Sequence, residues 1–265
     1  MSKTPFINEP QNLYEFPLLR RVTGDTLRPG GLQVTASALE LCGFSHGAKL
    51  LDVGCGAGAS LAFLGAQGFL PVGMDASPVL LAEAQSHGPV VLGDAQALPF
   101  SSGSFQGVFC ECVVSLLDKA DGFFQESYRV LEHDGWLVVS DIVRMPLPFS
   151  ASSASSSPLL ADSALPSTHP CNNQLKTPLE HEKSCLDGAK TRQSMERLFQ
   201  EHGFVVRHVV DYRRSLVELA AKMVWEFGSM NAFWELWRQN TSTECLGAPC
   251  AKQFGYELFI GQKRS

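Results

Sequence analysis

Residues 50–58 read LLDVGCGAG, a short apolar run that leads into three closely spaced glycines. Apolar runs of this length are typical of strands that are buried on both faces of a parallel sheet. Glycines at 54, 56 and 58 let the backbone turn sharply and leave room for a ligand against it. A helix predicted over residues 59–67 would present free backbone N–H groups to that ligand. The stretch therefore predicts a ligand-binding strand–turn–helix unit.

Strand and helix signals alternate on both sides of this stretch. A helix is predicted to start at Ser77-Pro78, because serine caps helices and proline suits their first turn. Alternating strands and helices imply a doubly wound α/β fold. We expect a mostly parallel seven-stranded sheet with strands at 49–53, 70–74, 90–92, 105–114, 136–143, 204–210 and 256–260.

Composition divides the chain into four parts of one expected domain, residues 1–265. Residues 1–45 are predicted to form an N-terminal helical cap, and residues 46–143 a cofactor-binding core. A Ser-rich stretch, Ser150–Ser157, marks an insertion after the fifth strand, which we expect to be flexible over residues 144–184. Residues 185–265 are expected to complete the sheet and to form the substrate side.

The charge balance restricts the partners. Lys and Arg total 21 against 27 Asp and Glu, which gives a formal net charge of −6. This charge argues against a broad electrostatic grip on nucleic acid or on an anionic membrane. No apolar run reaches the ~20 residues that span a bilayer, and Met1–Pro10 lacks the apolar core of a secretory signal. We expect a cytoplasmic protein with a small-molecule substrate; the oligomeric state stays open.

The 8 cysteines include no C-x-x-C pair, so the usual zinc and thioredoxin signatures are missing. No metal site is expected. In the cytoplasm these cysteines would be reduced thiols.

Three acidic residues, Asp52, Asp75 and Asp94, lie near the ends of the first three predicted strands. Open α/β sheets bind ligands at this carboxyl edge. Asp75 could accept both ribose hydroxyls, and Asp94 could accept from an exocyclic amine. Asp52 suits a ligand with an amino group and would repel a pyrophosphate. Glycines 54 and 56 with Ala59 also fit G-x-G-x-x-A, so a dinucleotide-dependent oxidoreductase remains an alternative.

These runs, followed by VFCECVVSLL (108–117) and RVLEHDGWLVVSD (129–141), resemble the class I S-adenosylmethionine-dependent methyltransferases. The resemblance implies S-adenosylmethionine as the cofactor and an antiparallel final strand that pairs with the sixth. It also implies roles for individual residues. The cofactor-binding residues would be Asp52, Gly54, Cys55, Gly56 and Gly58 for the amino-acid part, Asp75 and Ala76 for the ribose, Asp94 and Ala95 for the adenine, and Cys110 and Tyr14 beside the methionine.

A second, weaker similarity concerns Ser184–Ala189, which resembles a segment of the arsenite methyltransferases. Those enzymes bind the metalloid through thiolates. Cys185 matches that segment, and Cys245 or Cys250 could supply a second sulfur. The family's Asp-Cys-Tyr segment is replaced here by Ala59-Ser60-Leu61, so the acceptor stays open.

The sequence thus predicts a methyltransferase that acts on a small molecule, with arsenite or another thiophilic species among the candidates. Glu111, Cys185 and Cys245 are the candidate catalytic residues. A soft acceptor would need no strong base, whereas an oxygen or carbon acceptor would. A non-catalytic domain that binds S-adenosylmethionine for a partner protein is the other alternative.

Overall fold

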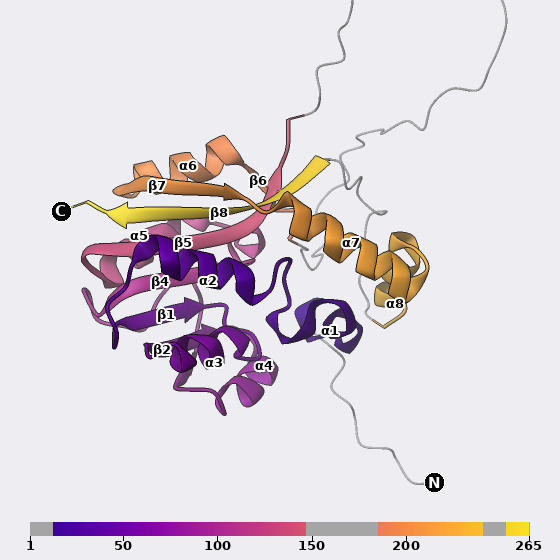
Figure 1. The fold of residues 1–265 in the computed structure, drawn as a ribbon, viewed down its shortest axis with the longest axis horizontal. Coiled ribbons are helices and arrows are strands. Elements are labelled where there is room, and N and C mark those ends of the chain that lie inside the picture. Colours follow the sequence, from indigo (N-terminus) through magenta and orange to yellow (C-terminus); the bar gives the residue numbers. More distant parts are fainter. Residues whose placement is uncertain (1–12, 147–184, 241–252, 265) are drawn as a thin grey trace, which may run out of the picture.

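The computed structural model describes residues 13–146, 185–240 and 253–264. Its centre is an eight-stranded sheet with the order β3-β2-β1-β4-β5-β8-β7, and a short strand β6 pairs with β5 (Figure 1). β1 to β5 are parallel, and β8 is antiparallel to both β5 and β7. The strands are β1 Lys49–Val53, β2 Leu70–Asp75, β3 Val90–Leu92, β4 Phe105–Glu111, β5 Leu131–Arg144, β6 Lys190–Thr191, β7 Phe204–Asp211 and β8 Phe254–Lys263.

Side chains alternate between the two faces of the sheet, as a two-residue period requires. Leu51 faces a core that α5 and α6 cover, whereas Leu50 faces a core that α2 covers. Both leucines are fully buried. The α-helices are α1 Pro17–Thr23, α2 Leu32–Cys42, α3 Ala59–Ala66, α4 Pro78–Ala84, α5 Ala120–Val130, α6 Arg192–Glu201, α7 Arg213–Phe227 and α8 Met230–Asn240.

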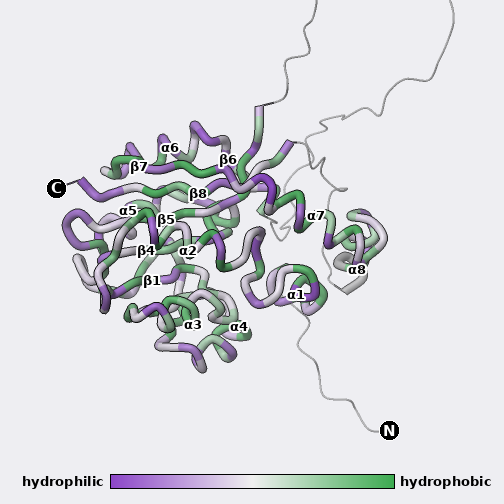
Figure 2. The backbone as a smooth tube through the Cα atoms, in the orientation of Figure 1, coloured by the Kyte–Doolittle hydropathy of each residue, from purple (hydrophilic) through white to green (hydrophobic). Residues whose placement is uncertain are grey.

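Three helices form a separate group beyond the carboxyl end of β1, where α1 lies close to α7 and α8 (Figure 1). Phe16 and Leu19 of the N-terminal cap share an apolar cluster there with Met223 and Phe233. Hydrophobic and hydrophilic segments alternate along α7 (Figure 2), and Trp225 on its outer side is 90% exposed. Within the described ranges, no helix has the length and apolarity to cross a membrane.

The predicted fold class is confirmed, including the antiparallel final strand. Two details differ. β5 begins at Leu131, because His133-Asp134-Gly135 forms an irregularity inside the strand, with Asp134 at φ 60°. The sheet also gains the two-residue β6, which no periodicity could have indicated. Most of the predicted flexible insertion, residues 147–184, lies outside the described residues.

Candidate functional site

A cavity of about 540 Å³ lies where β1, β2 and β4 end, a volume within the usual range for small-molecule sites. The N-terminal cap contributes one part of its wall, and the loops after the strands contribute the other. The cap residues include Tyr14, Asp25, Leu27 and Arg28; the loop residues include Gly54, Cys55, Gly56, Asp75, Ala76, Asp94, Ala95, Glu111 and Cys112.

The glycine-rich turn is shaped by positive backbone angles, with φ 77° at Gly54 and 54° at Gly56. A Cβ at position 54 would lie 2.2 Å from Cγ2 of Val113, so the close approach of these two loops requires glycine there. The Gly56 N–H donates to Oδ2 of Asp75 at 2.8 Å. The turn after β1 is thereby joined to the end of β2 at the cavity wall.

Asp75 accepts backbone hydrogen bonds on both oxygens, since Oδ1 also accepts from the Ser77 N–H at 2.8 Å. Burial raises the pKa of Asp75, and the backbone donors oppose that effect. A carboxylate has about four acceptor positions, so Asp75 retains acceptor capacity. Asp94, the next acid along this wall, accepts from the Gln96 N–H at 2.9 Å.

Asp52 is 2% exposed at the end region of β1. Among the described residues, its Oδ2 atom has no hydrogen-bond partner. Desolvation raises its pKa to about 7, Glu111 adds to the shift, and Arg28 opposes it. An orphaned, buried carboxylate oxygen of this kind calls for a cationic or hydrogen-bond-donating partner.

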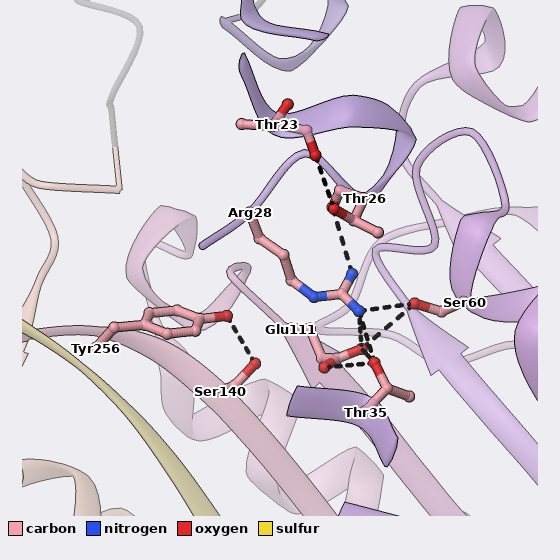
Figure 3. Close-up of polar contacts among 8 residues, drawn as sticks. All are labelled: Thr23, Thr26, Arg28, Thr35, Ser60, Glu111, Ser140 and Tyr256. Atoms are coloured by element: carbon pink, nitrogen blue, oxygen red, sulfur yellow. Dashed lines mark hydrogen bonds and ion pairs between the residues drawn. The ribbon is translucent and has the colours of Figure 1, made fainter. Parts of the chain in front are cut away.

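A buried polar network that sequence reasoning missed joins the cap to the sheet (Figure 3). Arg28 and Glu111 form an ion pair at 2.8 Å, with both side chains less than a tenth exposed. The Arg28 guanidinium also donates to the hydroxyl oxygens of Thr35 at 2.7 Å and Ser60 at 3.0 Å. Thr35 donates in turn to Glu111 at 3.1 Å. Glu111 therefore lines the cavity while its charge is already paired.

Tyr14, Cys112 and Cys185 form a second group on the cap side. Tyr14 and Cys112 line the cavity. Cys185 packs against the apolar cluster that contains Cys112, and the neighbouring Cys112 side chain lowers the pKa of Cys185, whereas burial opposes that shift. The Cys112 thiol correspondingly has a raised pKa. The sequence showed both cysteines, but not that they pack in the same cluster.

The structure does not bring every predicted residue to the cavity wall. Asp52 directly precedes the wall residues Val53 and Gly54 without lining the cavity itself, and Cys185 does not line it either. The side chain of Cys110 is fully buried in the core with Leu51 and Val108, because its place in β4 directs it to the α5 face. Gly58 packs against α4, where a Cβ would lie 2.9 Å from Cα of Ala84. Cys245 lies outside the described residues.

The region that forms the cavity resembles known proteins. A family described as "Methyltransferase domain" matches residues 51–139, which include the end of β1, the glycine-rich turn, Asp75, Asp94 and Glu111. This part of the chain matches a methyltransferase domain, in agreement with the class I methyltransferases that the sequence resembles. The match confirms the resemblance seen in the sequence and favours it over the oxidoreductase alternative. The domain implies S-adenosylmethionine as its cofactor.

Curated relatives point in the same direction. An uncharacterized methyltransferase of Bacillus subtilis is 31% identical over 45% of this chain and 54% of that protein. An arsenite methyltransferase of Halobacterium salinarum is 26% identical over 60% of this chain and 37% of that protein. The chain spans about half or less of the length of the curated relatives it matches. Other relatives are an 18S rRNA (guanine-N(7))-methyltransferase of Bos taurus and a demethylmenaquinone methyltransferase of Beutenbergia cavernae.

Among solved structures, a phosphoethanolamine N-methyltransferase of Haemonchus contortus in complex with S-adenosyl-L-methionine has a similar fold. The TM-score is 0.65 at 18% identity, over 93% of this chain and 56% of that one. This likeness supports the arrangement of the sheet and helices.

Proposed function

We propose that the protein transfers the methyl group of S-adenosylmethionine to a small acceptor in the cavity. The supporting observation is the convergence of the glycine-rich turn, Asp75 and Asp94 on one cavity within a methyltransferase domain. S-adenosylmethionine supplies an electrophilic methyl group on its sulfonium centre. The protein then has to hold donor and acceptor in line and exclude water.

The residues present fit the groups of this cofactor. Asp52 directly precedes the wall residues Val53 and Gly54, and an ammonium group of the cofactor would give its unpartnered Oδ2 a partner and relieve the cost of its burial. Asp75 would accept from the ribose hydroxyls with the acceptor capacity that its backbone bonds leave. Asp94 and Ala95 are placed along the same wall for the adenine.

The cap would exclude water during transfer. Arg28 anchors it to Glu111, and Arg20 reaches Glu83 of α4 at 2.7 Å. Ser77 donates to Glu15 at 2.6 Å, which joins the cap to the start of the same helix. The candidate catalytic role of Glu111 would then depend on release from Arg28, so we assign it first to closure of the cap.

The binding part of this proposal can be tested by calorimetry with S-adenosylhomocysteine. The substitution Asp75→Ala should weaken binding roughly ten- to a hundredfold, because a charged hydrogen bond contributes on the order of 1.5–3 kcal/mol. Asp121→Ala is the matched control, since that side chain is 71% exposed on α5. Unchanged affinity in Asp75→Ala, with an intact fold, would remove Asp75 from the site. Binding without any methyl transfer would favour the non-catalytic alternative.

For the acceptor, we propose a small thiophilic species in the cytoplasm. Cys112 lines the cavity, Cys185 packs against the cluster that contains Cys112, and soft thiolates prefer soft centres such as trivalent arsenic. In this proposal Cys112 supplies the second sulfur, for which the sequence had offered Cys245 or Cys250. The net charge of −6 disfavours RNA as the substrate.

The acceptor assay is methyl transfer to arsenite in the presence of glutathione. Cys185→Ser and Cys112→Ser should each abolish transfer, whereas Cys245→Ser should retain it. Absence of methylated arsenic from the wild-type protein would leave an organic acceptor as the proposal. Full activity in Cys185→Ser would exclude capture by this thiol pair.

A further inference from the structure

We propose that Asp141 is a positioning residue for the cavity, because its carboxylate holds the chain segment that follows β4, residues 112–118. Neither Asp141 nor Ser115, the residue that it binds in this segment, is among the residues that line the cavity. Asp141 therefore acts through the neighbours of Ser115 and not by touching a ligand. The consequence for cofactor binding rests on the proposed function.

The segment at residues 112–118 forms part of the cavity wall. Val113 lies so close to the glycine-rich turn that a Cβ at Gly54 would be 2.2 Å from its Cγ2. A shift of the segment would therefore alter the wall and the turn together. Five residues of the segment line the cavity: Cys112, Val113, Leu116, Leu117 and Asp118.

Ser115 attaches the segment to Asp141 through two hydrogen bonds. The Ser115 N–H donates to Oδ2 of Asp141 at 2.8 Å, and the Ser115 hydroxyl donates to Oδ1 at 2.6 Å. The Ile142 N–H also donates to Oδ1, at 2.7 Å. Asp141 and Ser115 are at most 2% exposed, and hydrogen bonds to a charged group are stronger than those between neutral groups. The carboxylate thus fixes the segment at one point on β5.

The opposite side of Ser115 is also closely packed. A Cβ at Gly188 would lie 1.8 Å from the carbonyl oxygen of Ser115, so the turn at 185–188 packs directly on this backbone. At the start of the segment, the Cys112 N–H donates to the carbonyl of Ser140 in β5 at 2.6 Å. The segment is therefore held between β5 and the turn, and Asp141 provides its side-chain attachment to β5.

The charge of Asp141 suits this role. Burial raises the pKa of Asp141 to about 6, and the hydrogen bonds from Ser115 and Ile142 oppose that shift. An ionised carboxylate accepts on both oxygens, whereas an amide of the same shape has an acceptor oxygen on one side and an NH₂ donor on the other. Asp141→Asn would therefore set two donors against each other at one of these contacts.

The test compares Asp141→Asn with Glu257→Gln by calorimetry with S-adenosylhomocysteine. Glu257 is the matched control, because it pairs with Asp141 across β5 and β8 and is buried, but binds Arg192 at 2.6 Å. Asp141→Asn should weaken binding roughly three- to thirtyfold, in the range of couplings between residues that share a contact. Glu257→Gln should lower the free energy of unfolding and leave the affinity unchanged. A purely structural role of Asp141 would give that same result for both variants.

Ser115 allows the same contact to be tested from the other side. Ser115→Ala removes the hydroxyl bond and should weaken binding less than Asp141→Asn does. The double variant should bind no more weakly than Asp141→Asn alone, because both residues act through one contact. Hydrogen exchange followed by mass spectrometry should show faster exchange at residues 112–118 in both single variants of this contact, but not in Glu257→Gln.

Two results would overturn the proposal. One is a folded Asp141→Asn protein with wild-type affinity, and the other is a Glu257→Gln protein whose affinity falls as far as that of Asp141→Asn. If Asp141→Asn does not fold, Ser115→Ala decides, since wild-type affinity and exchange in that variant would also overturn the proposal. Failure of the proposed function would be seen separately, as absence of S-adenosylhomocysteine binding to the wild-type protein, and the exchange measurement would still test the contact.

Discussion

Asp52 combines burial with a pKa raised to about 7, so its ionisation changes near neutral pH. An ammonium partner needs the ionised form. We therefore predict that S-adenosylhomocysteine affinity rises roughly tenfold between about pH 6 and about pH 8, as the ionised fraction grows. Calorimetry over this range measures the effect.

The same titration affects stability with a defined sign. Because the folded pKa lies above the unfolded value, Asp52 favours the folded state fully below about pH 4, and this contribution is lost as the pH rises through about 7. Asp52→Asn should remove the pH dependence of binding. A variant that retains the full dependence would show that another group controls it.

The Arg28–Glu111 ion pair gives a second prediction for single residues. Arg28→Met would leave Glu111 buried without its counter-charge, which should cost about 3–5 kcal/mol in the free energy of unfolding. The double variant Arg28→Met with Glu111→Gln should recover much of that loss, because no charge is then stranded. Urea unfolding of the four proteins in this cycle provides the measurement. If Arg28→Met had the same free energy of unfolding as the wild type, this result would contradict the burial of the ion pair.

Helix α4 is fixed at its start by Ser77, whose Oγ accepts from the Leu80 N–H at 3.1 Å and donates to Glu15 of the cap. Ser77→Ala should cost about 1 kcal/mol of stability through the lost helix cap. It should also weaken S-adenosylhomocysteine binding, because the N-terminal helical cap loses the hydrogen bond between Ser77 and Glu15. Ser86→Ala is the control at the other end of the helix, where the hydroxyl is exposed. Equal effects of the two substitutions on binding would show that this attachment is unimportant.

The whole molecule should be stabilised by its cofactor product, since the cavity joins the cap, the sheet and α4. At a hundredfold excess over the dissociation constant, S-adenosylhomocysteine should add about 2.7 kcal/mol to the free energy of unfolding. For a domain of this size that corresponds to a rise of several degrees, about 2–4 °C per kcal/mol. Thermal unfolding with NAD in parallel should show no shift. A shift with NAD alone would reverse the assignment.

Local patterns in the sequence predict the sheet and one wall of the site. Strand signals, the glycine-rich turn and the acids at the strand ends are local patterns. Parallel strands bring their carboxyl ends to one edge, so Gly54, Asp75 and Asp94 had to meet there once the fold class was known. Cys110 shows the limit of this reasoning, since the predicted strand did not tell which face its side chain would take.

The opposite wall of the cavity depends on packing between distant segments of the chain. Arg28 forms an ion pair with Glu111, and Cys185 packs against the cluster that contains Cys112, across long separations in the sequence. No periodicity encodes such contacts, because they depend on how the cap and the turn at 185–188 pack on the finished sheet. The buried charges and the clustered thiols are therefore properties of packing: each residue was visible in the sequence, but its partner, its burial and its ionisation were set by the fold.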